Sequence, residues 1–137
     1  MDPLSVTASI IAVIGLCGQV IGYIAAAKGA TKDRSQLKAE ILSCQSLLEA
    51  LKDETEDSDD SDDWANIIKT LEGLGAPLNV LEETLGLLAL KLGPKKNLQK
   101  AVKVLTWPFE AKEVSKILEV IERQKSSLSL ALENNNR

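Results

Sequence analysis

Histidine is absent from this 137-residue chain, and cysteine and aromatic residues are scarce. The absence of histidine excludes a Ser-His-Asp triad, a Cys-His pair and any His-ligated zinc or iron site. The two cysteines, Cys17 and Cys44, are too few for a four-thiolate site or a disulfide framework, so we expect core thiols in a reducing compartment. No phosphate-loop lysine follows the glycines of the segment 73–75, and no strand precedes them. We therefore expect no enzyme, no metal and no cofactor.

The composition favours helices over strands. Only two Trp, one Tyr and one Phe are present, whereas Leu, Ala, Lys and Glu are abundant. With 45% hydrophobic and 26% charged residues, the chain is long enough for one domain with one core. We predict an all-α fold over 1–137, a single helical bundle of four long helices plus one or two short ones.

The formal net charge of -4 is unevenly distributed. The stretch 53–63 (DETEDSDDSDD) holds eight of the 20 acidic residues and no base, which leaves 12 acids against 16 bases elsewhere. Its charges repel one another, and it lacks the glycine that a calcium-binding loop needs at its turn. We predict a solvated, mobile acidic loop over 53–63.

The segment from Pro3 to Ala27 contains no charged residue. Its large apolar residues follow helical spacing, and its other side is small or weakly polar. Gly18 and Gly22 form a G-x-x-x-G step, two glycines one helical turn apart, which lets another helix approach closely. We predict one helix that ends near Lys28 and Gly29. The apolar stripe consists of Val6, Ile10, Val13, Cys17, Val20, Ile21 and Ile24.

Four interpretations of this helix compete. A secretory signal is disfavoured because the chain begins Met1-Asp2 without a basic residue. A permanent membrane span is weakened by three glycines, Gln19 and several hydroxyl side chains. The helix can instead belong to the core of a bundle, or it can pack there in one state and enter a membrane in another.

Three further segments have leucine seams of helical spacing. We expect helices over about 33–52, from about Pro77 to Leu92, and over about 110–132, with short ones over 64–72 and 95–105. Trp107 and Phe109 are expected to anchor the core. The predicted inward residues of the three long helices are Leu37, Ile41, Cys44, Leu48, Leu51, Leu78, Leu81, Leu85, Leu88, Leu92, Val114, Ile117, Ile121, Leu128 and Ala131 or Leu132.

A run of lysines near the middle of the chain is a candidate patch for anionic lipid. Neither arginine nor an aromatic residue interrupts the run, so nucleic acid is a poor candidate partner. Lysines near an anionic membrane each contribute about 1 kcal/mol of binding free energy. A solvated helix face without a ligand is the alternative. The run consists of Lys91, Lys95, Lys96, Lys100 and Lys103.

Both ends of the chain show a family resemblance. The opening MDPLSVTASIIAVIGLCGQVIGY and the closing stretch WPFEAKEVSKILEVIERQKSSLSLAL resemble the HeLo-like (HELL-type) domains at the amino ends of fungal NLR-like STAND receptors. The resemblance implies a bundle similar to the four-helix executioner domain of the mixed-lineage kinase-like pseudokinase. It implies programmed cell death, as in heterokaryon incompatibility and innate immunity.

In such receptors a nucleotide-binding oligomerisation domain follows, and self-oligomerisation releases the first helix. The resemblance therefore implies a cytoplasmic protein that moves to the plasma membrane on activation and permeabilises it. The ending LENNNR without a second domain predicts the amino-terminal piece of a larger receptor.

Carried over to this sequence, the membrane-active helix would lie within 1–28. This stretch departs from HeLo-type helices that carry a charge, so no ion-conducting side chain is assigned. An interaction bundle for homotypic or adaptor binding, without membrane activity, is the alternative function; Gly18, Gly22 and the lysines would be its contacts. The lipid-facing residues would be Leu4, Ile10, Val13, Leu16, Val20, Ile21 and Ile24.

Overall fold

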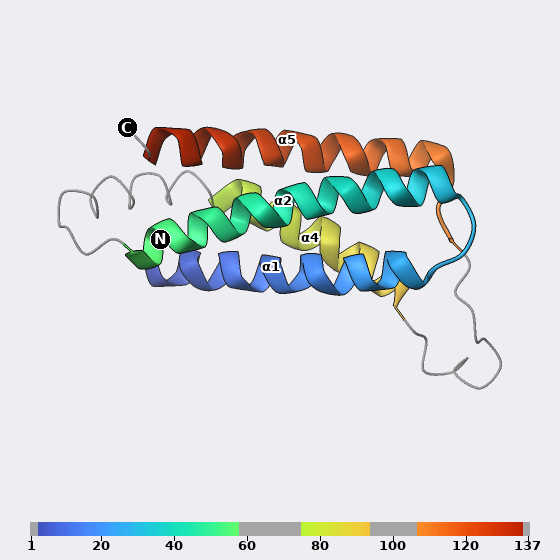
Figure 1. Ribbon diagram of the computed structural model, residues 1–137, viewed down its shortest axis with the longest axis horizontal. Helices are drawn as coiled ribbons and strands as arrows, with labels where there is room; N and C mark the ends of the chain where they lie inside the picture. Colours follow the sequence, from blue (N-terminus) through green and yellow to red (C-terminus); the bar gives the residue numbers. More distant parts are fainter. Residues whose placement is uncertain (1–2, 58–74, 94–106, 136–137) are drawn as a thin grey trace.

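The computed structural model describes residues 3–57, 75–93 and 107–135 and shows four long helices in these ranges (Figure 1). They are α1 (Pro3–Ala26), α2 (Thr31–Asp57), α4 (Gly75–Leu92) and α5 (Ala111–Asn135). No strand occurs within these ranges. The predicted all-α bundle of four long helices is therefore confirmed.

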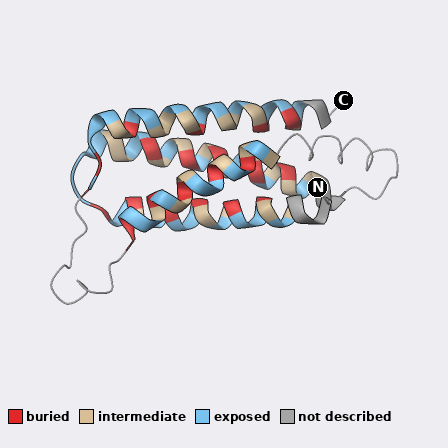
Figure 2. Ribbon diagram, turned by 180° about the vertical axis from the view of Figure 1, so that it is seen from behind, coloured by how far each residue is buried: buried red, intermediate tan, exposed pale blue. Residues whose placement is uncertain are grey.

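The four helices run alternately in opposite directions, so α1 begins and α5 finishes at the same end of the bundle (Figure 1). Helix α1 packs against α2 on one side and α4 on the other. Helix α5 packs against α2 and, much less extensively, against α4. Helix α4 crosses the others obliquely, and residues coloured as exposed lie on its outward side (Figure 2).

The core is built from the apolar stripes that the sequence predicts. Each described helix has its buried residues on the inward side (Figure 2), as three- and four-residue spacing requires. Ile117, Leu132 and Ile21 are only partly buried, at the edges of this core. The fully inward residues are Ile10, Val13, Cys17, Val20, Ile24, Leu37, Ile41, Cys44, Leu48, Leu51, Leu78, Leu81, Leu85, Leu88, Leu92, Val114, Ile121, Leu128 and Ala131.

Trp107 and Phe109 lie in the segment before α5 and are buried, as predicted for core anchors. Their rings meet edge to face, with centroids 5.2 Å apart and an angle of 69° between the planes. The Trp107 amide donates a hydrogen bond of 2.9 Å to the carbonyl of Lys28. This bond ties the start of the last helix to the turn between α1 and α2.

The turn between α1 and α2 is short because two consecutive residues have left-handed backbone angles. Gly29 has a φ of 96° and Ala30 a φ of 44°. Glycine takes this conformation without strain, whereas alanine does so at a cost. Helix α1 ends near the predicted stop at Lys28 and Gly29, and α2 begins at Thr31, two residues before the predicted start.

The predicted loop over 53–63 is wrong for its first five residues, because α2 continues through Asp57. Leu48 and Leu51 are buried and fix the preceding turns against the core. Each further residue then adds one backbone hydrogen bond, which outweighs the repulsion among solvated carboxylates. The rest of the acidic stretch, 58–63, lies outside the described residues, as do the predicted short helices over 64–72 and 95–105.

Candidate functional site

Helix α1 has two faces of different character, and neither carries a charge. One face is buried in the core, and the opposite face meets solvent with small or weakly polar side chains. Ile11 is the large apolar residue on the outer face, with 49% of its surface exposed. A solvent-facing helix surface normally carries charged residues, so the outer face of α1 is unusual. Its exposed residues are Ala8, Ile11, Ala12, Gly15, Gly18, Gln19, Gly22, Ala25 and Ala26.

The residues predicted to face lipid lie mostly in the core of this structure. Ile10, Val13, Val20 and Ile24 are at most 1% exposed. Leu16 and Ile21 are partly buried and pack against the core. Leu4 lies in α1, but its side chain is outside the described set. Access of these side chains to a membrane would therefore require α1 to leave its neighbours.

Gly18 and Gly22 lie on the exposed side of α1. A methyl group added at Gly18 would lie 3.6 Å from the Gln45 side-chain nitrogen of α2, and one at Gly22 would meet nothing within 4 Å. The described part of the bundle therefore does not use this step for close helix packing. The step remains available on the surface.

Hydrogen bonds donated by side chains of α2 connect α1 to the rest of the bundle. Arg34, in the first turns of α2, donates from Nε to the Gly29 carbonyl (2.6 Å) and from Nη1 to the Ile24 carbonyl (3.2 Å). Gln45 donates to the Ile14 carbonyl at 3.4 Å, a long hydrogen bond. Arg34 thus caps the end of α1, a role absent from the sequence prediction, since the spacing along one helix does not reveal a cap on another.

The polar side chains Gln19 and Tyr23 of α1 satisfy each other. The Gln19 side-chain amide donates a hydrogen bond of 2.9 Å to the Tyr23 hydroxyl, one helical turn away. Because both partners belong to α1, this bond does not depend on the rest of the bundle.

Cys17 of α1 and Cys44 of α2 are buried free thiols, as predicted. The hydrogen bond between the two sulfur groups raises the pKa of Cys17, and burial raises it further. An apolar interior favours the neutral thiol, so Cys17 remains protonated and unreactive at neutral pH. The pair marks the closely packed seam between α1 and α2.

Helix α1 is long and apolar enough to cross a membrane. The stretch Thr7–Ala26 has a mean hydropathy of 2.0, and only 28% of it is buried inside the bundle. By length and composition it resembles a membrane span, although the core helix of a soluble protein has the same properties.

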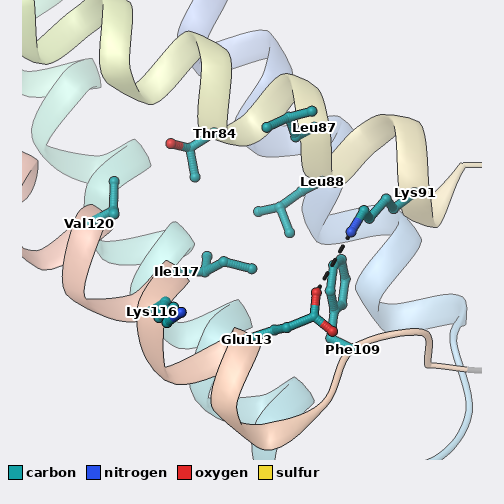
Figure 3. A pocket seen from close by; sticks show the side chains of 9 residues that line it. All are labelled: Thr84, Leu87, Leu88, Lys91, Phe109, Glu113, Lys116, Ile117 and Val120. Atoms are coloured by element: carbon teal, nitrogen blue, oxygen red, sulfur yellow. Dashed lines mark ion pairs between the residues drawn. The ribbon is translucent and has the colours of Figure 1, made fainter.

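Lys91 is the member of the predicted lysine patch that the structure describes. Its ammonium group lies 3.7 Å from a Glu113 carboxylate oxygen and 5.5 Å from the centre of the Phe109 ring (Figure 3). The Lys91 ammonium group, at the end of α4, therefore already contacts Glu113 and Phe109. Lys95, Lys96, Lys100 and Lys103 lie outside the described residues.

Between α4 and α5 lies a groove of about 330 Å³, with Lys91 at one end (Figure 3). The sequence prediction missed it, because a groove depends on how two helices diverge. Among the described residues no cluster of three or more His, Cys, Asp or Glu could hold a metal ion. The groove is lined by Thr84, Leu87, Leu88, Lys91, Phe109, Glu113, Lys116, Ile117 and Val120.

Fold and site together define an all-α four-helix bundle with one uncharged, membrane-length first helix. No family model, no curated protein and no solved structure matches this chain. The HeLo-like resemblance therefore remains a prediction from the two ends of the sequence.

Proposed function

We propose that this protein is an inducible membrane-permeabilising effector of the HeLo-like executioner type. The observation that carries the proposal is the outer face of α1, which is exposed to solvent and yet contains no charge. On self-oligomerisation α1 leaves the bundle and enters an anionic membrane. The non-enzymatic role, the cytoplasmic location before activation and a following nucleotide-binding domain belong to the same proposal.

The cost of releasing α1 explains why a trigger is needed. Burying one aliphatic side chain stabilises a fold by about 1.5–3 kcal/mol. Four aliphatic side chains of α1 are fully buried, so exposing them to water would cost on the order of 10 kcal/mol. That is similar to the whole stability of a small domain, about 5–15 kcal/mol. A bilayer interior would bury these four side chains again, so α1 can be released only when a membrane is present.

The polar contacts of α1 are compatible with such a transfer. Without charged residues, α1 has no ion pair to break. The bond between Gln19 and Tyr23 can enter the membrane with the helix, which lowers the cost of burying both groups. Release of α1 would break the hydrogen bonds that Arg34 and Gln45 of α2 donate to backbone carbonyls.

A leakage assay with outer-face variants tests the proposal. The full chain, tethered by a carboxy-terminal histidine tag to anionic vesicles with nickel-chelating lipids, should release an entrapped dye. Ala12→Lys places a charge at the middle of α1 on its exposed face. A lysine at the centre of a membrane helix costs about 2.5–3.5 kcal/mol, so leakage should slow by at least about tenfold.

Leu130→Lys is the matched control, because it adds the same charge on an exposed position of α5. It should leak at the wild-type rate, and both variants should keep the helical signal of the bundle. Equal leakage from Ala12→Lys and wild type would refute the proposal, as would sealed vesicles with wild type. Ile10→Lys is a poorer test, because Ile10 is fully buried and lysine there would also unfold the bundle.

Recruitment to the membrane by lysines is a separable part of the proposal. Reversing the charges of Lys96, Lys100 and Lys103 should weaken sedimentation with anionic vesicles at low salt. High salt should have the same effect on the wild type, since exposed charges are screened. Leakage by protein that is already tethered should persist, because the tag replaces the lysines.

The exposed glycine step supports a second candidate function, an interaction bundle that acts through homotypic contacts. Gly22→Leu would place a bulky side chain on the exposed face of α1, where an added Cβ meets nothing within 4 Å. If sedimentation shows discrete oligomers that Gly22→Leu abolishes, and vesicles never leak, the interaction bundle is the better description.

A further inference from the structure

The groove between α4 and α5 follows from the oblique course of α4. This helix packs closely on α1 and only lightly on α5, so the two helices diverge. Phe109 and the pair formed by Lys91 and Glu113 close one end of the gap (Figure 3). Thr84 and Val120 face each other at the other end (Figure 3). The result is an elongated hollow and not a flat surface.

The dimensions of the hollow suit a single alkyl chain. From Thr84 to Lys91 the helix advances about 10 Å, at about 1.5 Å per residue. The volume of about 330 Å³ equals roughly ten groups the size of a water molecule or a methylene, at about 30 Å³ each.

The chemistry of the lining changes along the hollow. Its walls are aliphatic, from Leu87 and Leu88 on α4 and from Ile117 and Val120 on α5. Lys91 pairs with the Glu113 carboxylate beside Phe109, and Lys116 lies apart from this pair on the α5 side of the lining (Figure 3). The local balance is one positive charge, since two lysines stand against one glutamate. An apolar chain with a single negative head would match both parts.

We propose that the α4–α5 groove binds a medium-chain fatty acid. The carboxylate lies beside Lys91 at the Phe109 end, and the alkyl chain runs along Leu88 and Ile117 toward Val120. The exposed side chain of Leu87 covers the chain from the solvent side. This site is on the opposite side of α4 from α1, so the proposal does not depend on membrane permeabilisation.

Calorimetric titration of the full chain with decanoate, below the concentration at which it forms micelles, tests the site. We expect saturable binding of one decanoate per chain. Val120→Trp fills the groove and should weaken binding by at least about tenfold. Leu130→Trp, of equal bulk on the exposed face of α5, should leave binding unchanged. Absent binding to wild type, or equal effects of the two variants, would overturn the proposal.

A second set of measurements tests the head group and allows for a poorly folded tryptophan variant. Leu87→Glu changes an exposed residue, so the bundle stays folded, and the new carboxylate should repel decanoate. Lys91→Met should weaken decanoate but leave the neutral decanol unaffected; equal loss for both would overturn the carboxylate assignment. If sedimentation shows a dimer that Leu87→Glu dissociates, a second copy occupies the groove and the fatty acid does not.

Discussion

Helices α1 and α5 have nearly the same length, 24 and 25 residues, but they present opposite surfaces to water. Helix α5 carries eight charged residues, from Lys112 to Glu133, and Lys125 pairs with Glu40 of α2 at 2.5 Å. Helix α1 carries none and is held by apolar packing and a few hydrogen bonds. Both surfaces suit a folded bundle, but only that of α1 also suits hydrocarbon. The difference supports the proposal that α1 moves between the bundle and a membrane.

The largest effect is expected from substitutions that truncate a buried side chain, one in α1 and one in α5. Ile24→Ala in α1 and Ile121→Ala in α5 both remove side chains that are 1% exposed. Each should lower the free energy of unfolding by about 2–5 kcal/mol. Urea denaturation followed by circular dichroism measures this, and Leu87→Ala, at an exposed position, is the control. A negligible loss for Ile24→Ala alone would show that α1 is not docked in solution.

A smaller effect is expected from the ion pair that distinguishes α5. The side chains of Lys125 and Glu40 are 27% and 17% exposed, so the pair is largely shielded from solvent. Lys125→Met should cost about 1–3 kcal/mol, between the values for exposed and buried pairs. Lys91→Met should cost less than about 1 kcal/mol, because the pair with Glu113 is exposed and long. Equal costs in thermal or urea unfolding would contradict this ranking.

The cap on α1 should have an effect of about 1 kcal/mol. Arg34→Met removes the hydrogen bonds to the Ile24 and Gly29 carbonyls, each of modest net value. Because the cap joins α2 to the end of α1, we also expect faster dye release from tethered vesicles. Arg34→Lys keeps the charge but loses the forked geometry, so an intermediate result is expected. A less stable variant with unchanged leakage would separate the cap from release.

The smallest effect concerns the outer face of α1. Gly22→Ala places a methyl group in open space within a helix, and it should raise the free energy of unfolding by about 0.5–1 kcal/mol. Gly93→Ala is the contrasting variant, since its methyl carbon would lie 2.6 Å from the Ala89 carbonyl oxygen. Loss of stability in Gly22→Ala would mean that another surface packs on this face in solution.

The sequence predicted those parts of the fold that depend on spacing within one helix. Most residues of the predicted stripes are buried, although Ile21 and Ile117 are only partly so, and the burial of Trp107 and Phe109 was predicted correctly. The course of α2 through 53–57 was predicted wrongly, because composition alone weighs charge repulsion but not the anchoring of the preceding turn by Leu51.

Features that join two helices could not be predicted in this way. The Arg34 cap, the pair of Lys125 with Glu40 and the groove beside Phe109 depend on how the helices cross and face one another. No residue spacing encodes these distances directly. The same limit applies to Ile10 and Val13. Their spacing places them on one stripe of α1, but it does not reveal whether that stripe packs against protein, as it does here, or against lipid.

The alternating directions of the four described helices have a consequence for assemblies. The start of α1 and the finish of α5 share one pole of the molecule (Figure 1). Any anchor or fused module attached behind α5 therefore sits beside the first turns of α1. If several copies were attached to one surface in this way, the first turns of their α1 helices would lie close together at that surface.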